Sequence, residues 1–170
     1  MAERTDLDLQ DLTRAEFPRL VGLLALYVGS VQTAEDLAQE ALIRLHQNWP
    51  RVKAMDSPRA WLTRVALNLG SSSLRRTYAE RRARSRIQGD RPAALPESAD
   101  VVAIRDAVSS LPRRERAVIV LRFYEGMSVA EVALQLRCPQ GTVKSLTSRG
   151  VEQLRRSMGT DVPEGRWSHV

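Results

Sequence analysis

Apolar side chains recur every three to four positions along most of the chain, which is the spacing of one face of an α-helix. Strict alternation of apolar and polar residues, which marks a half-buried strand, persists nowhere. The pattern therefore predicts an all-α fold. The predicted helices, each with one apolar face, cover residues 16–28, 34–49, 58–76, 101–111, 113–125, 129–136 and 140–158.

Capping signals predict the ends of the first two helices. Thr13 and Glu16 have the spacing of a capping box, in which two side chains bond the first free N–H groups of a helix. Pro18 is tolerated in a first turn but not deep inside a helix, so the first helix is expected to begin near Glu16. Thr33 is the expected cap of the second helix, and Pro50 is its expected end.

The later helices carry clearer signals. Ser57 followed by Pro58 combines a cap residue with proline at the first helical position. Ser128 and Glu131 form a second capping-box pattern. The third helix has a weak centre, because residues 70–73 are glycine and serine, which are poor helix formers. Some local looseness is therefore expected there.

The helical periodicity fades between residues 79 and 99, where two prolines, a glycine and clustered arginines appear. This composition is typical of a flexible basic linker. We therefore expect two small helical domains, residues 1–78 and residues 100–158. Residues 159–170 contain two glycines and a proline without periodicity, and they are expected to form a disordered tail.

Charge is distributed unevenly along the chain. The whole sequence has 26 Lys and Arg against 20 Asp and Glu, a net charge of +6. Residues 1–50 hold 4 basic and 8 acidic side chains, whereas residues 51–100 hold 11 and 5, and residues 101–170 hold 11 and 7. An acidic first part followed by a basic remainder suggests two kinds of partner, one of them polyanionic.

Residues that could carry chemistry are few. Cys138 is the single cysteine, which excludes an internal disulfide and a cysteine-based metal cluster. His46 and His169 have no ligand-forming neighbours in the sequence. No catalytic triad, phosphate-binding glycine loop or catalytic carboxylate pair is evident. We therefore expect no metal, no cofactor and no enzymatic activity.

Membrane and export signals are also missing from the pattern. The start of the chain is acidic and polar, unlike a signal peptide. The most apolar run, residues 20–28, is far shorter than the roughly 20 residues of a membrane-spanning helix. These features predict a soluble, cytoplasmic protein that has no membrane partner.

Residues 128–150 contain two amphipathic stretches separated by a short turn, and Pro139 opens the second. Two short helices joined by three or four residues form the helix-turn-helix unit, whose second helix enters the major groove of DNA. A plain helical hairpin with solvated polar residues would have the same spacing. If the unit binds DNA, the polar side chains available on the second helix are Gln140, Thr142, Lys144, Ser145, Ser148 and Arg149.

The helix predicted over residues 34–49 keeps acidic and amide side chains away from its apolar stripe. These side chains are Glu35, Asp36, Gln39 and Glu40. Charges on a helix face are usually only solvated. In a chain that is otherwise basic, however, a concentrated acidic face could dock on a basic surface of another protein.

Several basic, aromatic and amide side chains have two interpretations. The arginines between residues 75 and 91 would attract phosphate in a salt-dependent manner, or they solvate a linker. Trp49 and Trp61 could stack on bases, although tryptophans at helical spacing more often pack in a core. Asn68 could read a base or satisfy a local hydrogen bond.

Three segments, in this order, resemble a known family. They are AEDLAQEALIRLHQNW, SPRAWLTRVALNLGSSSLRR and LPRRERAVIVLRFYEGMSVAEVALQLRCPQGTVKSLTSRGVEQLRR. Across residues 13–157 they are similar to bacterial RNA polymerase sigma factors of the extracytoplasmic-function group within the sigma-70 family, in particular its small actinobacterial members. The resemblance implies an alternative sigma factor that binds core RNA polymerase and directs promoter-specific transcription initiation.

The resemblance also implies roles for individual residues. The family pattern Asp-x-x-Gln-Glu stands here as Asp36, Gln39 and Glu40, which together with Glu35 would meet the clamp helices of the largest polymerase subunit. The helix-turn-helix would read the promoter −35 element as duplex, and the polymerase flap is a further implied contact. The first domain would melt the −10 element through Trp49, Arg51, Lys53, Trp61, Arg64, Asn68, Arg75 and Arg76.

Two positions depart from the family pattern, and one further partner is implied. Ser72 stands where members often have an acidic residue, so its contacts are in doubt. Leu146 stands where an arginine is common, which would remove a phosphate or base contact and make the −35 preference unusual or weak. Members of the family are usually held by an anti-sigma factor, which would cover the binding faces of both domains.

Two functions of other classes fit the same residues. A stand-alone helix-turn-helix repressor or activator would bind duplex operators tightly as a dimer and without polymerase. A sigma factor would instead bind DNA weakly alone and form a stoichiometric complex with core enzyme. An RNA-binding adaptor is the third candidate, and only the arginine run favours it.

Overall fold

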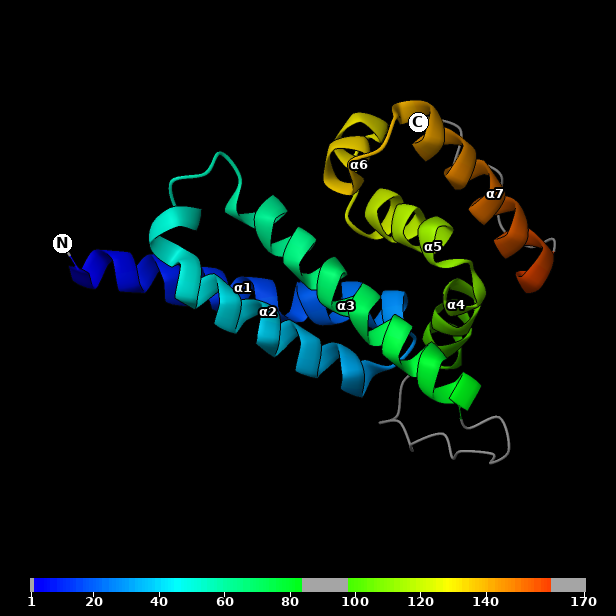
Figure 1. Cartoon of the computed structure of the whole chain (residues 1–170), viewed down its shortest axis with the longest axis horizontal. Helices are drawn as coiled ribbons and strands as arrows, with labels where there is room; N and C mark the ends of the chain where they lie inside the picture. Colours follow the sequence, from blue (N-terminus) through cyan, green and yellow to red (C-terminus); the bar gives the residue numbers. More distant parts are fainter. Residues whose placement is uncertain (1, 84–97, 160–170) are drawn as a thin grey trace. The chain divides into compact units, whose positions relative to one another are not determined.

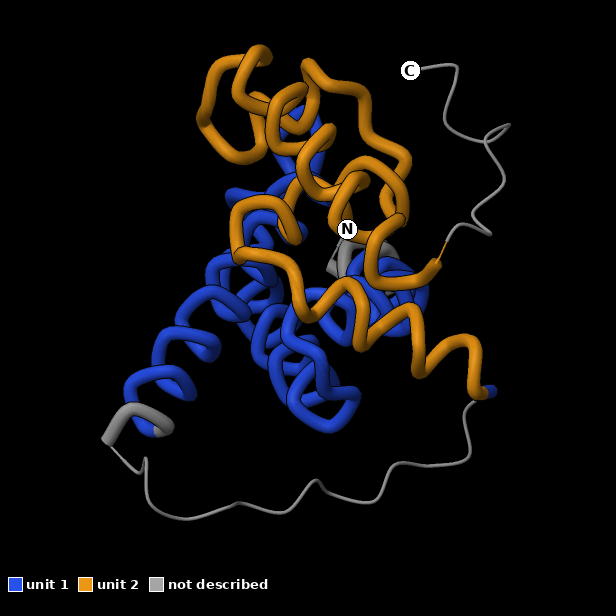
Figure 2. Tube along the Cα trace, turned by 90° about the vertical axis from the view of Figure 1, so that its right-hand side faces the viewer, with its two compact units in different colours: residues 1–98 blue, residues 99–170 orange. Residues whose placement is uncertain are grey.

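A computed structural model describes residues 2–83 and 98–159, with side chains placed for residues 9–80 and 98–159. Every regular element within these ranges is helical, which confirms the all-α prediction. The chain folds as two compact units, residues 1–98 and residues 99–170 (Figure 2). None of the described helices combines the length and the apolar character that a bilayer-spanning segment requires.

The first unit is built from three long helices, α1 (Ala2–Val28), α2 (Val31–Val52) and α3 (Pro58–Ala83). Each helix packs against the other two, and they lie side by side in Figure 1. Gly29 has a φ of 81°, a left-handed conformation that glycine adopts without strain, and it ends α1. The short connection that follows brings α2 back along α1.

The core of the first unit joins leucines of α1 and α3 to alanines of α2. Ala34, Ala38 and Ala41 line the inner face of α2, and small side chains there allow the neighbouring helices to approach closely. Burial of each large apolar side chain stabilises the fold by about 1.5–3 kcal/mol. The large side chains that are almost fully buried in this unit are Leu20, Leu23, Leu24, Tyr27, Leu45, Val52 and Leu62.

The first helix does not begin where its capping signals predicted. The helix α1 continues through Pro18, and Thr13 lies in its interior, where the Thr13 hydroxyl donates to the Leu9 carbonyl at 2.7 Å. Glu16 is buried and forms an ion pair with Arg19. Pro18 is exposed, so water can solvate the carbonyl that a proline leaves without its N–H partner.

Both predicted ends of α2 were also wrong by a few residues. Ser30, not Thr33, is the N-cap, because the Ser30 Oγ accepts from the Thr33 N–H at 3.3 Å. Pro50 lies inside the last turn rather than ending it, and the helix runs on to Val52. The Lys53 N–H then closes the turn on the Trp49 carbonyl at 2.9 Å.

The start of α3 agrees with its signal, but its centre does not. Ser57 caps the helix, since its Oγ accepts from the Ala60 N–H at 3.1 Å. The helix is continuous across residues 70–73, where looseness was predicted, and it extends to Ala83, past the expected start of the linker. Glycine at position 70 is explained by packing: a Cβ there would lie 2.8 Å from the Tyr27 ring, so a larger side chain would displace that ring.

The second unit contains α4 (Ala99–Ser110), α5 (Arg113–Ile119), a π-helical turn η1 (Val120–Tyr124), α6 (Val129–Leu136) and α7 (Gln140–Met158). The last helix is central, because α4, α5 and α6 all pack against it. Arg116 joins α4 to α5 by donating to the carbonyls of Ser109 and Leu111. The core side chains of this unit are Val108, Leu111, Ala117, Val118, Ile119, Val120, Leu121, Val132, Ala133, Val143 and Leu146.

The helices α6 and α7 form the predicted helix-turn-helix. Arg137 turns the chain in a left-handed conformation, with a φ of 52°, and α7 begins directly after Pro139. The predicted capping box is present: the Ser128 N–H donates to Glu131 Oε2 at 2.7 Å, and the Glu131 N–H donates to Ser128 Oγ at 3.2 Å. Hydrogen bonds from the Ser128 side chain and backbone lower the pKa of the Glu131 carboxyl from its ordinary value.

The predicted linker and tail fall mostly beyond the part of the chain that the structure describes. Residues 84–97 and 160–170 lie outside it. The helix α4 begins at Ala99, one residue before the expected start of the second domain.

Candidate protein and nucleic-acid interfaces

The acidic face of α2, made by Glu35, Asp36, Gln39 and Glu40, is exposed along its whole length. It lies opposite the buried alanines of the same helix, so packing in the core fixes the direction in which the acidic face points. Glu40 has an ion pair with Arg44, in which Nη2 and Oε1 are 2.6 Å apart. The acidic face is thus held by helix geometry and one local pair.

Ile43, one helical turn beyond Gln39 and Glu40, is a surface residue that was not predicted from the sequence. Its side chain is 56% exposed, a high value for a large apolar residue in a helix with a well-formed core. An apolar residue three positions after Glu40 on the polar side of the helix was the available signal. The acidic face therefore has an apolar neighbour that a protein partner could cover.

Four residues of α3 that were predicted to bind DNA share one side of the helix. Trp61, Arg64, Asn68 and Arg75 recur at three-, four- and seven-residue spacing, which aligns them along a single stripe. Asn68 and Arg75 are exposed, and Trp61 and Arg64 are half-buried. Arg75 Nη2 donates to the Ser72 hydroxyl at 3.0 Å, so Ser72 belongs to the same surface.

The other predicted −10 residues flank this stripe in the sequence. Arg51 and Lys53 are exposed at the end of α2, and Arg76 is exposed on α3. Trp49 is half-buried, and its indole Nε1 is buried without a hydrogen-bond partner. Neither Trp49 nor Trp61 is a fully buried core residue.

The helix α7 presents the residues that were predicted to bind duplex DNA. Exposed on it are Gln140, Lys144, Ser145, Ser148 and Arg149, whereas Thr142 is half-buried.

The prediction that Leu146 removes a DNA contact from α7 is corrected by the burial of its side chain. Its side chain is only 6% exposed and packs in the core with Val143, three positions earlier. This position points inward, so the leucine contributes to the fold of the unit. Its presence does not remove a side chain from the exposed side of α7.

Arg149 is linked to a neighbouring helix. Its Nε lies 3.6 Å from the Oε1 atom of Glu115 on α5. Glu115 is buried, and the Arg149 side chain is 64% exposed. The two helices come this close because Gly150 faces α5: a Cβ there would lie 2.8 Å from Ile119 Cγ1.

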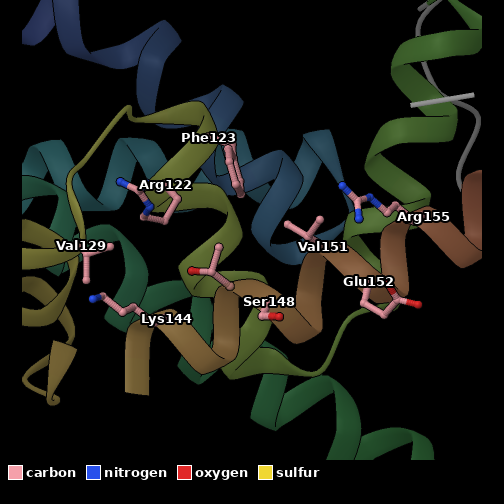
Figure 3. Close-up of a pocket in the computed structure, with 9 residues that line it drawn as sticks. Arg122, Phe123, Val129, Lys144, Ser148, Val151, Glu152 and Arg155 are labelled. Carbon is pink, nitrogen blue, oxygen red and sulfur yellow. The ribbon is translucent and has the colours of Figure 1, made fainter. Parts of the chain in front are cut away.

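A pocket of about 420 Å³ opens beside α7, between that helix, η1 and the start of α6. Figure 3 shows the side chains of α7 along one side of the pocket and those of Arg122 and Phe123 along the other. Three basic side chains, Arg122, Lys144 and Arg155, line it together with one acidic side chain, Glu152. Arg122 and Arg155 were not predicted here, because the elements that carry them, η1 and α7, line one pocket only in the folded unit.

Metal chemistry finds no support in the described residues. No group of three or more His, Cys, Asp or Glu side chains within them could hold a metal ion. What the described residues offer instead is helix faces that carry charged, hydrogen-bonding and aromatic side chains.

Comparisons with known proteins agree with this division. Residues 12–80 match the family model described as Sigma-70 region 2, and residues 102–154 match the model described as Sigma-70, region 4. The ECF RNA polymerase sigma factor SigW of Bacillus subtilis is 32% identical, over 77% of this chain and 78% of that protein. The RNA polymerase sigma-E factor of Streptomyces antibioticus is 30% identical, over 94% of this chain and 89% of that protein.

A solved structure has the same fold. The sigma factor RpoE of Bartonella quintana, in its co-crystal structure with the anti-sigma factor NepR, superposes with a TM-score of 0.75. The superposition covers 89% of this chain and 96% of RpoE, at 24% sequence identity.

Two units that each match a sigma-70 region, in the family order, define a DNA-binding regulator of transcription. The chain belongs to the extracytoplasmic-function sigma factors, and it is therefore an alternative sigma factor that directs transcription initiation.

Proposed function

We propose that the two units divide promoter recognition between them. The first unit would hold core RNA polymerase through the acidic face of α2 and read the melted −10 element through the stripe on α3. The second unit would read the −35 element as duplex through α7. The observation that carries this proposal is that most side chains of the three surfaces are exposed, on helices whose opposite sides are buried. Each surface is thereby available to a partner without any loss of core packing.

The polymerase contact would combine charged and polar side chains with one apolar neighbour. Asp36 and Glu40 supply negative charge, which would meet a basic surface on the clamp helices, and Gln39 adds a neutral hydrogen-bonding group. Ile43 would be covered in the complex. Charge complementarity of this kind raises the association rate and selects the correct partner.

The −10 contact would trap unpaired bases of one DNA strand. Removing a base from the stack costs a few kcal/mol, which new contacts must offset. Asn68 offers an exposed amide that can donate to and accept from a base edge. Trp61 can stack on a base, and Arg75 can neutralise a nearby phosphate.

The −35 contact would follow the usual geometry of a helix-turn-helix. The first turns of α7 would lie in the major groove, where each base pair shows a distinct pattern of donors and acceptors. Lys144 and Arg149 would bind phosphates or guanine edges, and Gln140 can read adenine. The pocket beside α7 adds Arg122 and Arg155 to the positive field near the DNA backbone.

A protein inhibitor is proposed as a further partner, and the cytoplasm is proposed as the place of action. The RpoE structure is that of a complex with an anti-sigma factor, which supports an equivalent partner for this chain. Such a partner would compete for the acidic face of α2 and for α7. The catalysis of RNA synthesis would belong to core polymerase, because the proposed role of this chain is binding.

The first test is complex formation with core RNA polymerase. The purified full chain and core enzyme would be mixed and separated by gel filtration. Co-elution near one-to-one is the expected result. A folded, inhibitor-free protein that elutes apart from the polymerase would contradict the proposal and would favour a stand-alone DNA-binding regulator.

The second test concerns the −35 element. Run-off transcription by the holoenzyme would be compared on promoters with intact and scrambled −35 sequences. Lys144→Ala combined with Arg149→Ala should lower −35-dependent transcription by about tenfold. Arg156→Ala, which removes an exposed arginine later in α7, is the matched control and should have little effect. Equal output of the unmutated holoenzyme from both promoters would remove this assignment.

A further inference from the structure

The strongest feature that the proposed function leaves unused is the ion pair between α5 and α7. Glu115 is only 8% exposed, and its carboxylate is supplied by a helix that takes no part in the predicted DNA surface. Its one ion pair among the described residues is with Arg149 on α7, across 3.6 Å. A buried carboxylate is expensive unless a cation compensates it, so this placement requires an explanation.

Backbone packing sets the geometry of this pair. The absence of a side chain at Gly150 lets α7 lie directly against Ile119 of α5. Glu115 is four residues before Ile119, which is one helical turn, so both face the same part of α7. The neighbour of Gly150 in the sequence, Arg149, is thereby brought beside the carboxylate while most of its side chain remains in solvent.

The terminal amino groups of Arg149 remain available to contact a ligand, because Glu115 lies beside the Nε atom. The guanidinium has five N–H donors, of which the Nε–H is one and the two terminal amino groups carry four. The atom nearest to Glu115 is Nε, at the inner edge of the group. A guanidinium held along its inner edge keeps its terminal donors for a bidentate contact with phosphate or guanine.

We propose that Glu115 is a positioning residue for promoter recognition: it holds Arg149 in the orientation in which this arginine contacts −35 DNA. The inference rests on the proposed function, because it needs Arg149 to touch DNA. A long arginine side chain that is already ordered loses less conformational entropy when it binds than a freely moving one.

A second ion pair of the same helix provides a built-in comparison. Arg156 Nε and Glu152 Oε1 are also 3.6 Å apart, but both side chains are well exposed and both belong to α7. Exposed pairs at this spacing contribute little and hold neither side chain firmly. The distance is therefore equal in the two pairs, and only burial of the carboxylate on a second helix distinguishes Glu115.

The experiment is a double-mutant cycle on the holoenzyme. Glu115→Gln, Arg149→Ala and the double variant would be compared by transcription from promoters with intact and scrambled −35 elements. We expect Glu115→Gln to lower the preference for the intact element about three- to tenfold in the unmutated background, and to have no further effect when Arg149 is alanine. Arg156→Ala, which breaks the exposed ion pair of α7 instead, should leave the preference unchanged.

The possible results separate the two proposals. If Arg149→Ala leaves the preference unchanged, the DNA contact assigned to Arg149 is wrong and the positioning role falls with it. If Arg149→Ala lowers the preference but Glu115→Gln does not, only the positioning role is overturned. An equal effect of Glu115→Gln with and without Arg149 would mean that Glu115 supports the fold alone.

A further variant covers the case in which Glu115→Gln does not fold. Arg149→Lys keeps the positive charge but offers a single ammonium group, which cannot serve the carboxylate and DNA from separate edges. It should lose several-fold of the −35 preference while thermal unfolding stays unchanged. Full preference in Arg149→Lys would overturn the proposal.

Discussion

The acidic face of α2 and the exposed side of α7 are both polar surfaces of amphipathic helices, but they are supported differently. The acidic face stands on alanines in a three-helix core, and its single ion pair joins two residues of the same helix. On α7, Arg149 is held by a buried carboxylate of another helix, next to a glycine that permits the contact.

The difference indicates which substitutions should impair binding at each surface. On α2, a change to an exposed side chain should alter binding and leave stability intact, because none of the described residues packs over the acidic face. On α7, binding and packing are coupled, so that a change in α5 or at Gly150 should reach the DNA surface. The predictions below test this contrast, beginning with the largest expected effect.

The largest effect is expected from reversing charge on α2. Asp36→Arg combined with Glu40→Arg should weaken binding to core RNA polymerase on the order of a hundredfold, because two attractive contacts become repulsive. The thermal unfolding midpoint should fall only slightly, since both side chains are exposed and the pair that Glu40 forms with Arg44 is a solvent-exposed one. Asp11→Arg makes one such charge reversal at an exposed position of α1 and is the control. Unchanged affinity of the double variant would show that the acidic face is only solvated.

Two glycines, one in each unit, test how much close helix packing contributes to stability. Gly70→Ala and Gly150→Ala should each destabilise the protein by about 1–3 kcal/mol, because the added Cβ would lie 2.8 Å from a core side chain. The larger loss is expected at Gly70, where the obstacle is the rigid ring of Tyr27, whose hydroxyl is hydrogen-bonded to Ser71. The measurement is denaturant unfolding.

The control for both is Gly141→Ala. A Cβ there would meet nothing within 4 Å, and alanine is the better helix former by about 0.5–1 kcal/mol. This variant should therefore be at least as stable as the unmutated chain. Destabilisation by all three alanines alike would mean that close packing is not the cause.

A smaller effect is expected at the start of the helix-turn-helix. Ser128→Ala should cost about 1 kcal/mol of stability, because the first turn of α6 loses its side-chain cap. Ser157→Ala removes a hydroxyl that only donates to the Leu154 carbonyl near the end of α7, and it should change little. Equal midpoints of thermal unfolding for the two variants would argue against the capping role.

The smallest effect is a pH dependence from Glu131. The pKa of its carboxyl is lower in the folded state than the ordinary value of 4.5, because Ser128 hydrogen-bonds the charged form. The stabilisation is therefore complete above that ordinary value, and it is lost as the pH falls through the lower, folded-state pKa. The stability advantage over Glu131→Gln should be constant above pH 4.5 and should shrink across the acid range below it. An advantage that is constant over this range would contradict the assignment.

The sequence predicted the general plan of the molecule well. Helical periodicity identified the helices, because burial of one face imposes a period of 3.6 residues on any helix that packs. The resemblance to the sigma family was confirmed by matches over both units. The individual polymerase and DNA contacts stay predictions, although the structure places most of these side chains in solvent.

The errors have a common physical cause. Pro18 was taken to mark the start of the first helix, and Pro50 the end of the second. Local rules count only the hydrogen bond that proline removes. The packing of long helices in a shared core outweighs that cost when the freed carbonyl faces solvent. In the same way, glycine at position 70 was interpreted as weakness, whereas it is a contact surface for Tyr27.

By itself, the sequence determined where helices form and which side of each helix is apolar, since these depend on local spacing. The order of the two sigma regions came from the resemblance of three segments to the family. Only the tertiary structure decided that Leu146 points inward, that Gly150 admits α5, and that Glu115 lies beside Arg149. Contacts between helices depend on how ridges and grooves of different segments fit together. That fit arises when the whole core packs, and no short stretch of sequence contains it.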